Sequence, residues 1–431
     1  MTGVWGRVWI AGATALAIVA GGVSCAAAGR DEKSKAAGAS VTPSATGPVL
    51  SAEEIAEQKM LAAIDVTLKA RATALQAGQL PQYLATSDPK NAKLVQRDKQ
   101  VFANLRQIGM KQVSYLRQVS FSPELRPKLG KNARAVRIKM LTQIAGIDPA
   151  PRLTQLGYTF VERDGRWLVV DDDDAESGDR GEGREPWELG EIEVSRGRGV
   201  LVISSPGEGE NGRRLVREAE AAVPLVRATA KRAQAGILVV AMAAPRSWSG
   251  FETGGHPAGA VAQRNLTPTN AEATEFKVTA SRIVINPTER KEADRALLAH
   301  EFAHAAMSPL GEGAPTWLVE GYAEYVQYKM LEQSNFSDFV DRERREFRRE
   351  LKALVVLPID GVFHGDYDEN SYGVAWLIVE HLVKTYGQTT VNAFYTELAK
   401  GADDPVLRDK ALVKYFKLTE PALVAALKKA S

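Results

Sequence analysis

Hydrophobic residues recur at every third or fourth position soon after residue 50. Because an α-helix makes one turn in 3.6 residues, this spacing places them on one helical face. The pattern predicts an amphipathic helix that begins near Ser51 and a second helix shortly after it. The residues that form the two apolar faces are Leu61, Ile64, Leu68, Ala72 and Leu75 in the first, and Leu94, Val101, Leu105 and Ile108 in the second.

Shorter apolar segments that are typical of strands follow at 112–121, 133–144 and 158–170. Within the last of these, Asp164-Gly165 separates two apolar segments, which indicates a tight hairpin turn. Helices followed by an antiparallel sheet predict an α+β accessory domain over 51–174. This element order and the hairpin resemble cystatin-like and SnoaL-like domains, and the resemblance implies an accessory or docking role.

The second half of the chain alternates strand and helix patterns. Strands are expected at 192–205, 237–241, 258–263 and 276–285, with a helix at 213–235, so the segment opens in βαβ fashion. The next helix is predicted to begin at Asn286, because Pro287 suits the first helical position and Glu289 completes a capping pattern. Pro309 and Gly311 are expected to end that helix. From 374 onward the pattern is helical.

Inside that predicted helix the chain reads His300-Glu301-Phe302-Ala303-His304, which is the pattern H-E-x-x-H. Histidines four residues apart share a helical face, so both imidazoles can reach one metal ion. Glu301 points into the same cleft, where it can take a proton from a metal-bound water. Two of the five histidines of the chain stand here, which favours a metal-dependent hydrolytic site over a chance pattern.

A zinc site of this kind needs a third protein ligand and leaves a fourth position for water. The next predicted helix reads Trp-Leu-Val-Glu-Gly-Tyr-Ala-Glu-Tyr over 317–325. Glu320 and Glu324 are four residues apart on one face, so by spacing alone either of them could reach the metal.

Together, the two motifs resemble those of the gluzincin metallopeptidases, the thermolysin-like "peptidase MA" group. In that group a glutamate within W-L-x-E-G-x-A-x-Y completes the zinc site. The resemblance implies a zincin-like domain over 188–431 that binds one Zn²⁺ through His300, His304 and Glu320. It also implies that Glu324 orients a ligand histidine. The residues that carry this resemblance most specifically lie between Ala299 and Tyr325.

Asn370-Ser371-Tyr372-Gly373 is similar to the Y-x-K-G segment of zinc aminopeptidases, although no lysine is present and Val374 follows. The similarity implies that Tyr372 hydrogen-bonds the developing oxyanion, with aromatic packing as the other interpretation. His364 and Tyr367 are further candidates for the same role.

The N-terminus has the character of a targeting segment. Arg7 precedes an apolar run of small residues that ends at Cys25, the only cysteine of the chain. Residues 1–25 are therefore predicted to be a signal peptide. Cys25 resembles the lipidation site of bacterial lipoproteins, although Gly22 stands where leucine is usual. The segment 26–50, rich in small and polar residues, is expected to be a flexible linker. This predicts an exported protein anchored on the extracellular side of the cell membrane through a lipid or an uncleaved N-terminal segment, or otherwise secreted.

The overall composition excludes one class of partner. With 55 basic and 53 acidic residues the formal net charge is +2, which gives no electrostatic case for nucleic acid. A single cysteine excludes intrachain disulfides. Asp171 to Asp174 and the following glycine-rich run suggest a solvated acidic linker over 175–187, with calcium binding as the other interpretation.

These observations predict an exported zinc peptidase that hydrolyses peptide or protein substrates by a zinc-bound water activated by Glu301. No acidic motif that would anchor a free amino terminus is evident, which favours an endopeptidase. A catalytically silent zinc-binding lipoprotein, acting as a binding or scaffold module at the cell surface, is the alternative. Hydrolysis of a non-peptide amide or ester is a third hypothesis, because the same metal chemistry permits it.

Overall fold

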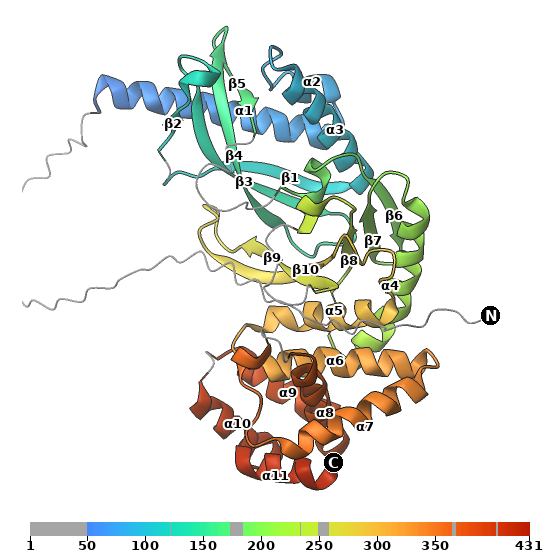
Figure 1. Cartoon of the computed structure of the whole chain (residues 1–431). Helices are drawn as coiled ribbons and strands as arrows, with labels where there is room; N and C mark the ends of the chain where they lie inside the picture. The colour runs from blue at the N-terminus through green and yellow to red at the C-terminus, as the bar shows by residue number, and fades with distance from the viewer. Residues whose placement is uncertain are drawn as a thin grey trace, which may run out of the picture.

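The structure is a computed structural model that describes residues 50–120, 122–172, 184–232, 234–248, 258–363, 368–401 and 404–431. The predicted signal peptide with Cys25, most of both predicted linkers, and the candidates His364 and Tyr367 lie outside these ranges. Figure 1 shows three layers, with the N-terminal helices and first sheet at the top, a second sheet in the middle and a helical lobe below.

The N-terminal helices agree with the hydrophobic pattern. Their bounds are α1 Ala52–Ala77, α2 Leu80–Leu84 and α3 Ala92–Ile108. Ser51 and Glu54 form a capping box at the start of α1, and Gly78 ends it with a φ of +70°. The predicted apolar faces are buried, apart from a partly exposed Leu61, which confirms both helices. The short α2 was not predicted, since five residues are too few to show a helical period.

The first sheet is antiparallel, and its strands follow the order β1-β3-β4-β5. The strands are β1 Met110–Arg117, β3 Arg134–Ile144, β4 Arg152–Arg163 and β5 Arg166–Asp171, with the short β2 Glu124–Leu125 paired to β3. Asp164 and Gly165 join β4 to β5 with φ angles of +50° and +74°. Positive φ at both residues is what a two-residue hairpin turn requires, so the predicted hairpin is confirmed.

The second sheet has the order β6-β7-β8-β10-β9. Its strands are β6 Glu193–Gly197, β7 Val200–Ser204, β8 Ile237–Ala241, β9 Ala260–Pro268 and β10 Phe276–Ile285. Helix α4 (Gly209–Ala230) connects the parallel strands β7 and β8, which confirms the βαβ opening. The single strand predicted over 192–205 is wrong, because the chain reverses at Arg198-Gly199 and forms the β6–β7 hairpin.

The second sheet separates two hydrophobic cores. Side chains such as Leu201, Leu238 and Val284 pack with the N-terminal layer, whereas Val202, Val239 and others of opposite parity pack with the helical lobe. Side chains alternate between the faces of a strand, so one sheet can serve both cores. The segment predicted to be an accessory domain therefore packs on one face of the second sheet, and the helical lobe packs on the other face.

A buried ionic network, here called the Glu185 network, joins the two sheets. Glu185 is 1% exposed and precedes the short 3₁₀ helix η3 (Pro186–Glu188). Its carboxylate accepts a hydrogen bond of 2.6 Å from Arg152 on β4, another from Thr154, and one of 2.5 Å from Arg282 on β10. Gln263 on β9 accepts from the Nε of Arg282 at 2.5 Å. Residues 185–187 thus form a buried connection, in contrast to the solvated linker that composition suggests.

The helical lobe begins under the second sheet. Its helices are α5 Arg295–Met307, α6 Thr316–Gln333, α7 Ser337–Ala353, α8 Asp368–Tyr386, α9 Gln388–Ala399, α10 Pro405–Phe416 and α11 Glu420–Ala430. Short 3₁₀ turns stand at η4 Pro245–Trp248, η5 Ser308–Leu310 and η6 Asp360–Phe363. Figure 1 shows α5 directly below β9 and β10, with α6 beneath it. This stacking confirms the helical character predicted for the C-terminal segment.

The predicted start of the zinc-motif helix at Asn286 is wrong. Helix α5 begins after Asp294, whose side chain accepts hydrogen bonds from the backbone N–H groups of Ala296 and Leu297. Asn286 instead holds a turn, accepting from the N–H of Thr288, and donates to the carbonyl of Ala258 at 3.0 Å. A tertiary contact has therefore recruited the residue that by sequence looks like the cap.

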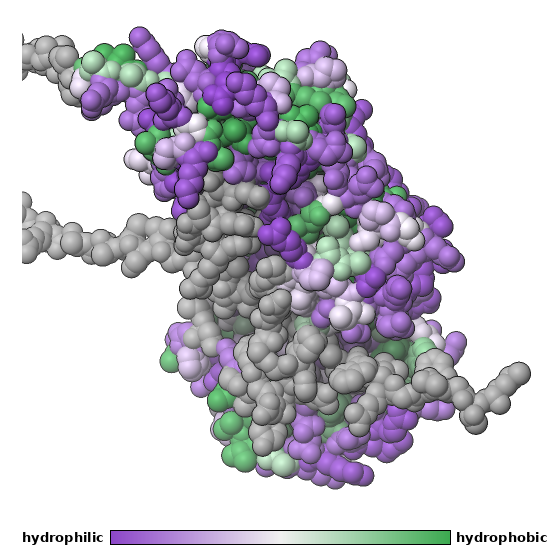
Figure 2. Space-filling view, turned by 45° about the horizontal axis from the view of Figure 1, so that its top comes forward, coloured by the Kyte–Doolittle hydropathy of each residue, from purple (hydrophilic) through white to green (hydrophobic). Residues whose placement is uncertain are grey.

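Figure 2 shows a surface dominated by hydrophilic residues, with hydrophobic ones gathered over the N-terminal elements and along the lower edge. Among the residues that the structure describes, no helix is both long and apolar enough to cross a membrane.

Candidate metal centre

Helices α5 and α6 bring three potential metal ligands to one point. His300 and Glu320 are fully buried and His304 is 8% exposed. The Nε2 atoms of the two histidines are 3.0 Å apart. The Oε2 atom of Glu320 lies 3.3 Å from the Nε2 of His304 and 3.7 Å from that of His300. In the described part of the chain, this is the one group of three such side chains whose ligand atoms converge.

These separations fit a zinc ion. Tetrahedral bonds of about 2.0 to 2.1 Å place neighbouring ligand atoms about 3.3 Å apart, close to the three observed distances. Apart from the two histidines, the buried carboxylate of Glu320 has no hydrogen-bond partner among the described residues. Neutral imidazoles compensate a buried negative charge only in part, and a cation at the centre of the group would compensate it.

The electrostatics of the group keep His300 and Glu320 in the forms that bind metal. For His304, burial acts to lower the pKa, but the charges of Glu320 and Glu301 outweigh it, so the pKa is raised. Burial lowers the pKa of His300, which favours the neutral imidazole. Burial acts to raise the pKa of Glu320, but the neighbouring His304 outweighs it, so the net pKa is lowered and the carboxylate stays ionised. A neutral imidazole and a carboxylate are the forms that donate electron pairs to a metal.

Glu301 lies on the same turn of α5 and is 1% exposed. Burial raises the pKa of its carboxyl to about 7, and the charge of His304 and a hydrogen bond from the backbone of Ala262 act in the opposite direction. A carboxyl with a pKa near the working pH can both accept and return a proton, as a general base requires. The contact with Ala262 also places Glu301 beside the edge strand β9.

Glu324 approaches the opposite side of the ring of His300. Its Oε1 atom is 3.4 Å from the Nδ1 of His300, whereas the Nε2 of that ring faces Glu320. Burial, with the nearby charges of Glu320 and Glu301, raises the pKa of Glu324 to about 8. The geometry therefore favours Glu320 as the ligand and Glu324 as the group that orients His300, a choice that spacing alone left open.

At a pH above 8, where Glu324 is ionised, replacing it by Gln should weaken zinc binding by about 10-fold, because a neutral amide supports the Nδ1 proton of His300 less well than a carboxylate. The change in affinity can be measured by competition with a chromogenic chelator. Glu346→Gln on the exposed face of α7 is the matched control and should leave the affinity unchanged. Equal affinities for the two variants would contradict the role of Glu324.

The tyrosine expected to stabilise the oxyanion is buried on α8. Tyr372 is 6% exposed, and its ring packs edge-to-face on Phe363 at 5.3 Å. A second tyrosine, Tyr395 on α9, was missed by the sequence analysis because its helix carries no motif. Burial raises the pKa of Tyr395, and the charge of Glu320 adds to the effect, so its hydroxyl lies within electrostatic range of the metal centre.

The acidic cluster suggested as a calcium site is partly described. The carboxylate of Asp172 is ion-paired with Arg97 and lies 3.7 Å from Arg184, while Asp171 is 3.9 Å from Arg97. Because arginines occupy the carboxylates at these two positions, the contacts favour the loop interpretation over a calcium site. Asp173 and Asp174 lie outside the described residues.

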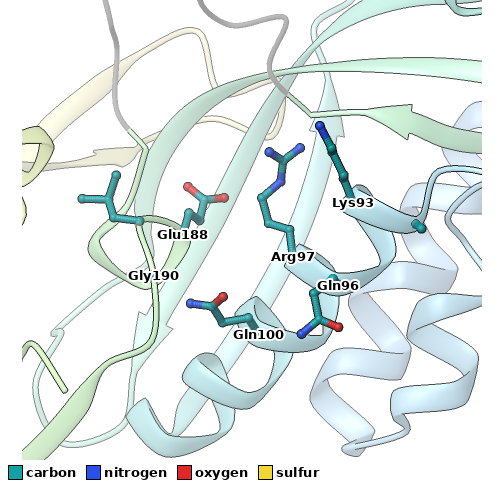
Figure 3. Close-up of a pocket in the computed structure, with 8 residues that line it drawn as sticks. Lys93, Gln96, Arg97, Gln100, Glu188 and Gly190 are labelled. Carbon is teal, nitrogen blue, oxygen red and sulfur yellow. The ribbon is translucent and has the colours of Figure 1, made fainter. Parts of the chain in front are cut away.

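A separate cavity of about 510 Å³ lies between α3 and η3. Figure 3 shows Lys93, Arg97 and Gln100 on α3 facing Glu188 and Gly190. Burial raises the pKa of Glu188 to about 7. None of the three potential metal ligands lines this cavity, so it is distinct from the metal centre.

No protein-family model matches the sequence, and no curated protein matches it either. Among solved structures it is similar to yeast LTA4 hydrolase in complex with bestatin, with a TM-score of 0.35 and 10% identity over 71% of this chain. A second is a two-domain M1 zinc metallopeptidase bound to L-tryptophan, with a TM-score of 0.33 and 12% identity over 74% of this chain. The match spans 50% and 60% of those chains respectively. Likenesses this weak do not transfer an activity to this chain.

Proposed function

We propose that the protein is a zinc-dependent peptidase. The observation that supports this most directly is the convergence of His300, His304 and Glu320 around one point, with Glu301 buried on the same helical turn. A zinc site that served only to stabilise the fold would use four protein ligands, whereas three converge among the described residues, and it would gain nothing from a buried Glu301. The intact carboxylate therefore favours a hydrolase over the catalytically silent alternative.

The roles follow from position and chemistry. Zinc, when bound, would act as a Lewis acid that polarises the substrate carbonyl and lowers the pKa of a bound water to about 7. Glu301 accepts the proton of the attacking water and then delivers it to the leaving amine, so that one proton moves from water to product. Tyr372 remains our predicted donor of a hydrogen bond to the oxyanion. Among the described residues β9 pairs with β10 alone, so its other edge, beside Glu301, offers backbone groups along which a peptide can extend.

The test is proteolysis of a complex peptide library by the zinc-loaded chain, with the cut sites identified by mass spectrometry. A metal-stripped sample and the same sample after zinc is restored serve as controls. Cuts that depend on zinc support the peptidase, and their positions decide between endopeptidase and aminopeptidase action. Zinc-dependent hydrolysis of simple esters or amides without any peptide cleavage would favour the third hypothesis instead.

We also propose that the protein is exported and anchored to the cell membrane through Cys25. The support is the sequence pattern alone, since these residues lie outside the described part of the chain. In cells of a bacterial host, Cys25→Ala should move the protein from the membrane fraction to the soluble exported fraction. Unchanged partitioning of the variant would contradict lipidation at this residue.

A further inference from the structure

Strand β9 forms one edge of the second sheet, and its residues alternate in direction. The backbone of Ala262 reaches Glu301, and the side chain of Ala262 packs with the core of the helical lobe. The β9 residues on either side of Ala262 face the N-terminal layer: Val261 belongs to its core, and Gln263 accepts a hydrogen bond from Arg282 of the Glu185 network. Arg264 has the same parity as Ala262, so its side chain lies on the face toward the metal helices.

Arg264 is paired with one carboxylate that is itself open to solvent. Its guanidinium forms an ion pair with Glu312, and the side chains are 24% and 53% exposed. Glu312 lies in the short connection between η5 and α6, between Gly311 and Gly313. A Cβ on Gly313 would stand 1.6 Å from the carbonyl oxygen of Gly401, so the backbone of this connection is tightly packed. Glu312 is thus held beside Arg264 by its backbone, while its carboxylate remains exchangeable.

The surroundings of Arg264 include the metal centre. Burial acts to lower the pKa of His304, but the charges of Glu320 and Glu301 outweigh it, so the net pKa is raised. The positive charge of Arg264 opposes that rise. Burial lowers the pKa of Arg264 itself, and Tyr395 acts in the opposite direction. Arg264 is a partly desolvated cation on a strand that packs on α5, the helix of the two histidines, and it stands one side-chain repeat along β9 from Ala262, whose backbone contacts Glu301.

We propose that Arg264 determines substrate specificity by binding a carboxylate of the peptide, either an acidic side chain or a free C-terminus. This rests on the proposed peptidase function. A peptide that extends along the free edge of β9 passes Ala262 beside Glu301 and then Arg264, about 7 Å further along the strand. Its carboxylate replaces that of Glu312, and the exchange costs little because exposed ion pairs contribute little. The carboxylate of Glu312 therefore competes with the carboxylate of the peptide for the guanidinium of Arg264.

The two partners of the ion pair should then act in opposite directions. Arg264→Gln should weaken the binding of an acidic peptide by about 10-fold, because the bound peptide would shield its ion pair with Arg264 from water, whereas the pair with Glu312 is exposed. Glu312→Gln should strengthen it, because the competing carboxylate is removed. If the pair only stabilised the fold, both changes would remove the same contact and have effects of the same sign.

The experiment measures binding in full-length, zinc-loaded protein that carries Glu301→Gln, so that no probe is consumed. The probes are fluorescein-labelled peptides of one Gly/Ser/Ala sequence with a single central Glu, Gln or Lys and an amidated C-terminus, and the Gln peptide with a free C-terminal carboxylate. Affinities are read by fluorescence anisotropy with Arg264 and Glu312 unchanged, with Arg264→Gln and with Glu312→Gln. Circular dichroism and Tm confirm that each variant is folded.

Tighter binding of the Glu peptide than of the Gln and Lys peptides, lost in Arg264→Gln and enhanced in Glu312→Gln, is the expected result. If the free-acid Gln peptide alone shows this behaviour, the bound group is the C-terminal carboxylate. Equal affinity for all four peptides, or effects of the same sign in both variants, overturns the proposal. Failure of the peptidase function is distinguished by the parallel library digest, in which protein with Glu301 intact would make no zinc-dependent cuts.

Discussion

Replacing Glu301 by Gln should lower kcat/KM for peptide hydrolysis by about 10²- to 10⁴-fold, the usual contribution of a general base. The amide keeps the size of the side chain but cannot accept a proton from water at neutral pH. Glu301 is not one of the three converging ligands, and its Oε2 atom is buried without a hydrogen-bond partner among the described residues. The zinc content should therefore remain near one ion per chain, which elemental analysis of the purified variant can measure.

The pairing of lost activity with retained zinc is the informative outcome. Glu346→Gln, on the exposed face of α7, is the matched control and should cleave as the unchanged protein does. Replacement of a ligand, such as His304→Ala, should instead lose both zinc and activity. A Glu301→Gln protein that keeps full activity would refute the role assigned to Glu301, even if zinc is bound.

The core of the candidate site could be predicted from sequence because its ligands lie within two short helical motifs. Spacing of four residues fixes His300 and His304 on one face whatever the rest of the fold does. Spacing could not choose between Glu320 and Glu324, because both stand on the same face of α6. Only the position of the ring of His300 between them, with Nε2 toward one and Nδ1 toward the other, distinguishes the two glutamates.

Features that depend on contacts between distant segments were not predictable. The expected cap at Asn286 satisfied every local rule, yet a hydrogen bond to Ala258 draws it into a turn, and Asp294 caps α5 instead. Arg264 lay beyond the expected end of its strand, and nothing in its neighbours indicates that Glu312, 48 residues away, faces it. Local periodicity identifies elements, whereas tertiary contacts decide where they begin and which charges meet.

The Glu185 network was invisible in the sequence for the same reason, and it carries the largest expected effect on stability. Glu185→Gln should destabilise the fold by about 3 to 5 kcal/mol, because the buried Arg282 and the largely buried Arg152 then lose their counter-charge. The loss should destabilise Arg282 more than Arg152, since burial and the like charge of Arg152 already lower the pKa of Arg282 to about 10. In thermal unfolding followed by circular dichroism, Tm should fall by roughly 5 °C or more.

The loss of Tm caused by Glu185→Gln should become smaller as the pH falls. Burial acts to raise the pKa of Glu185, but Arg152 and Arg282 outweigh it and hold the pKa at about 2, below the ordinary value of 4.5. A group whose pKa is lowered on folding stabilises the fold above its unfolded pKa and loses that contribution as the pH falls toward its folded pKa. The difference in Tm between the unchanged protein and Glu185→Gln should thus be constant above about pH 4.5 and should shrink between that pH and 2.

Two further variants separate the charge of Glu185 from its packing. Glu124→Gln removes the partner of Arg126 in an exposed ion pair and should change Tm little. The combined change Arg152→Met, Glu185→Leu and Arg282→Met replaces the three charges of the network with apolar groups of similar length, so neither arginine is left without a counter-charge and much of the lost Tm should return. If this combined variant is less stable than Glu185→Gln alone, the network contributes through its hydrogen-bond geometry, and the explanation by uncompensated arginine charge is wrong.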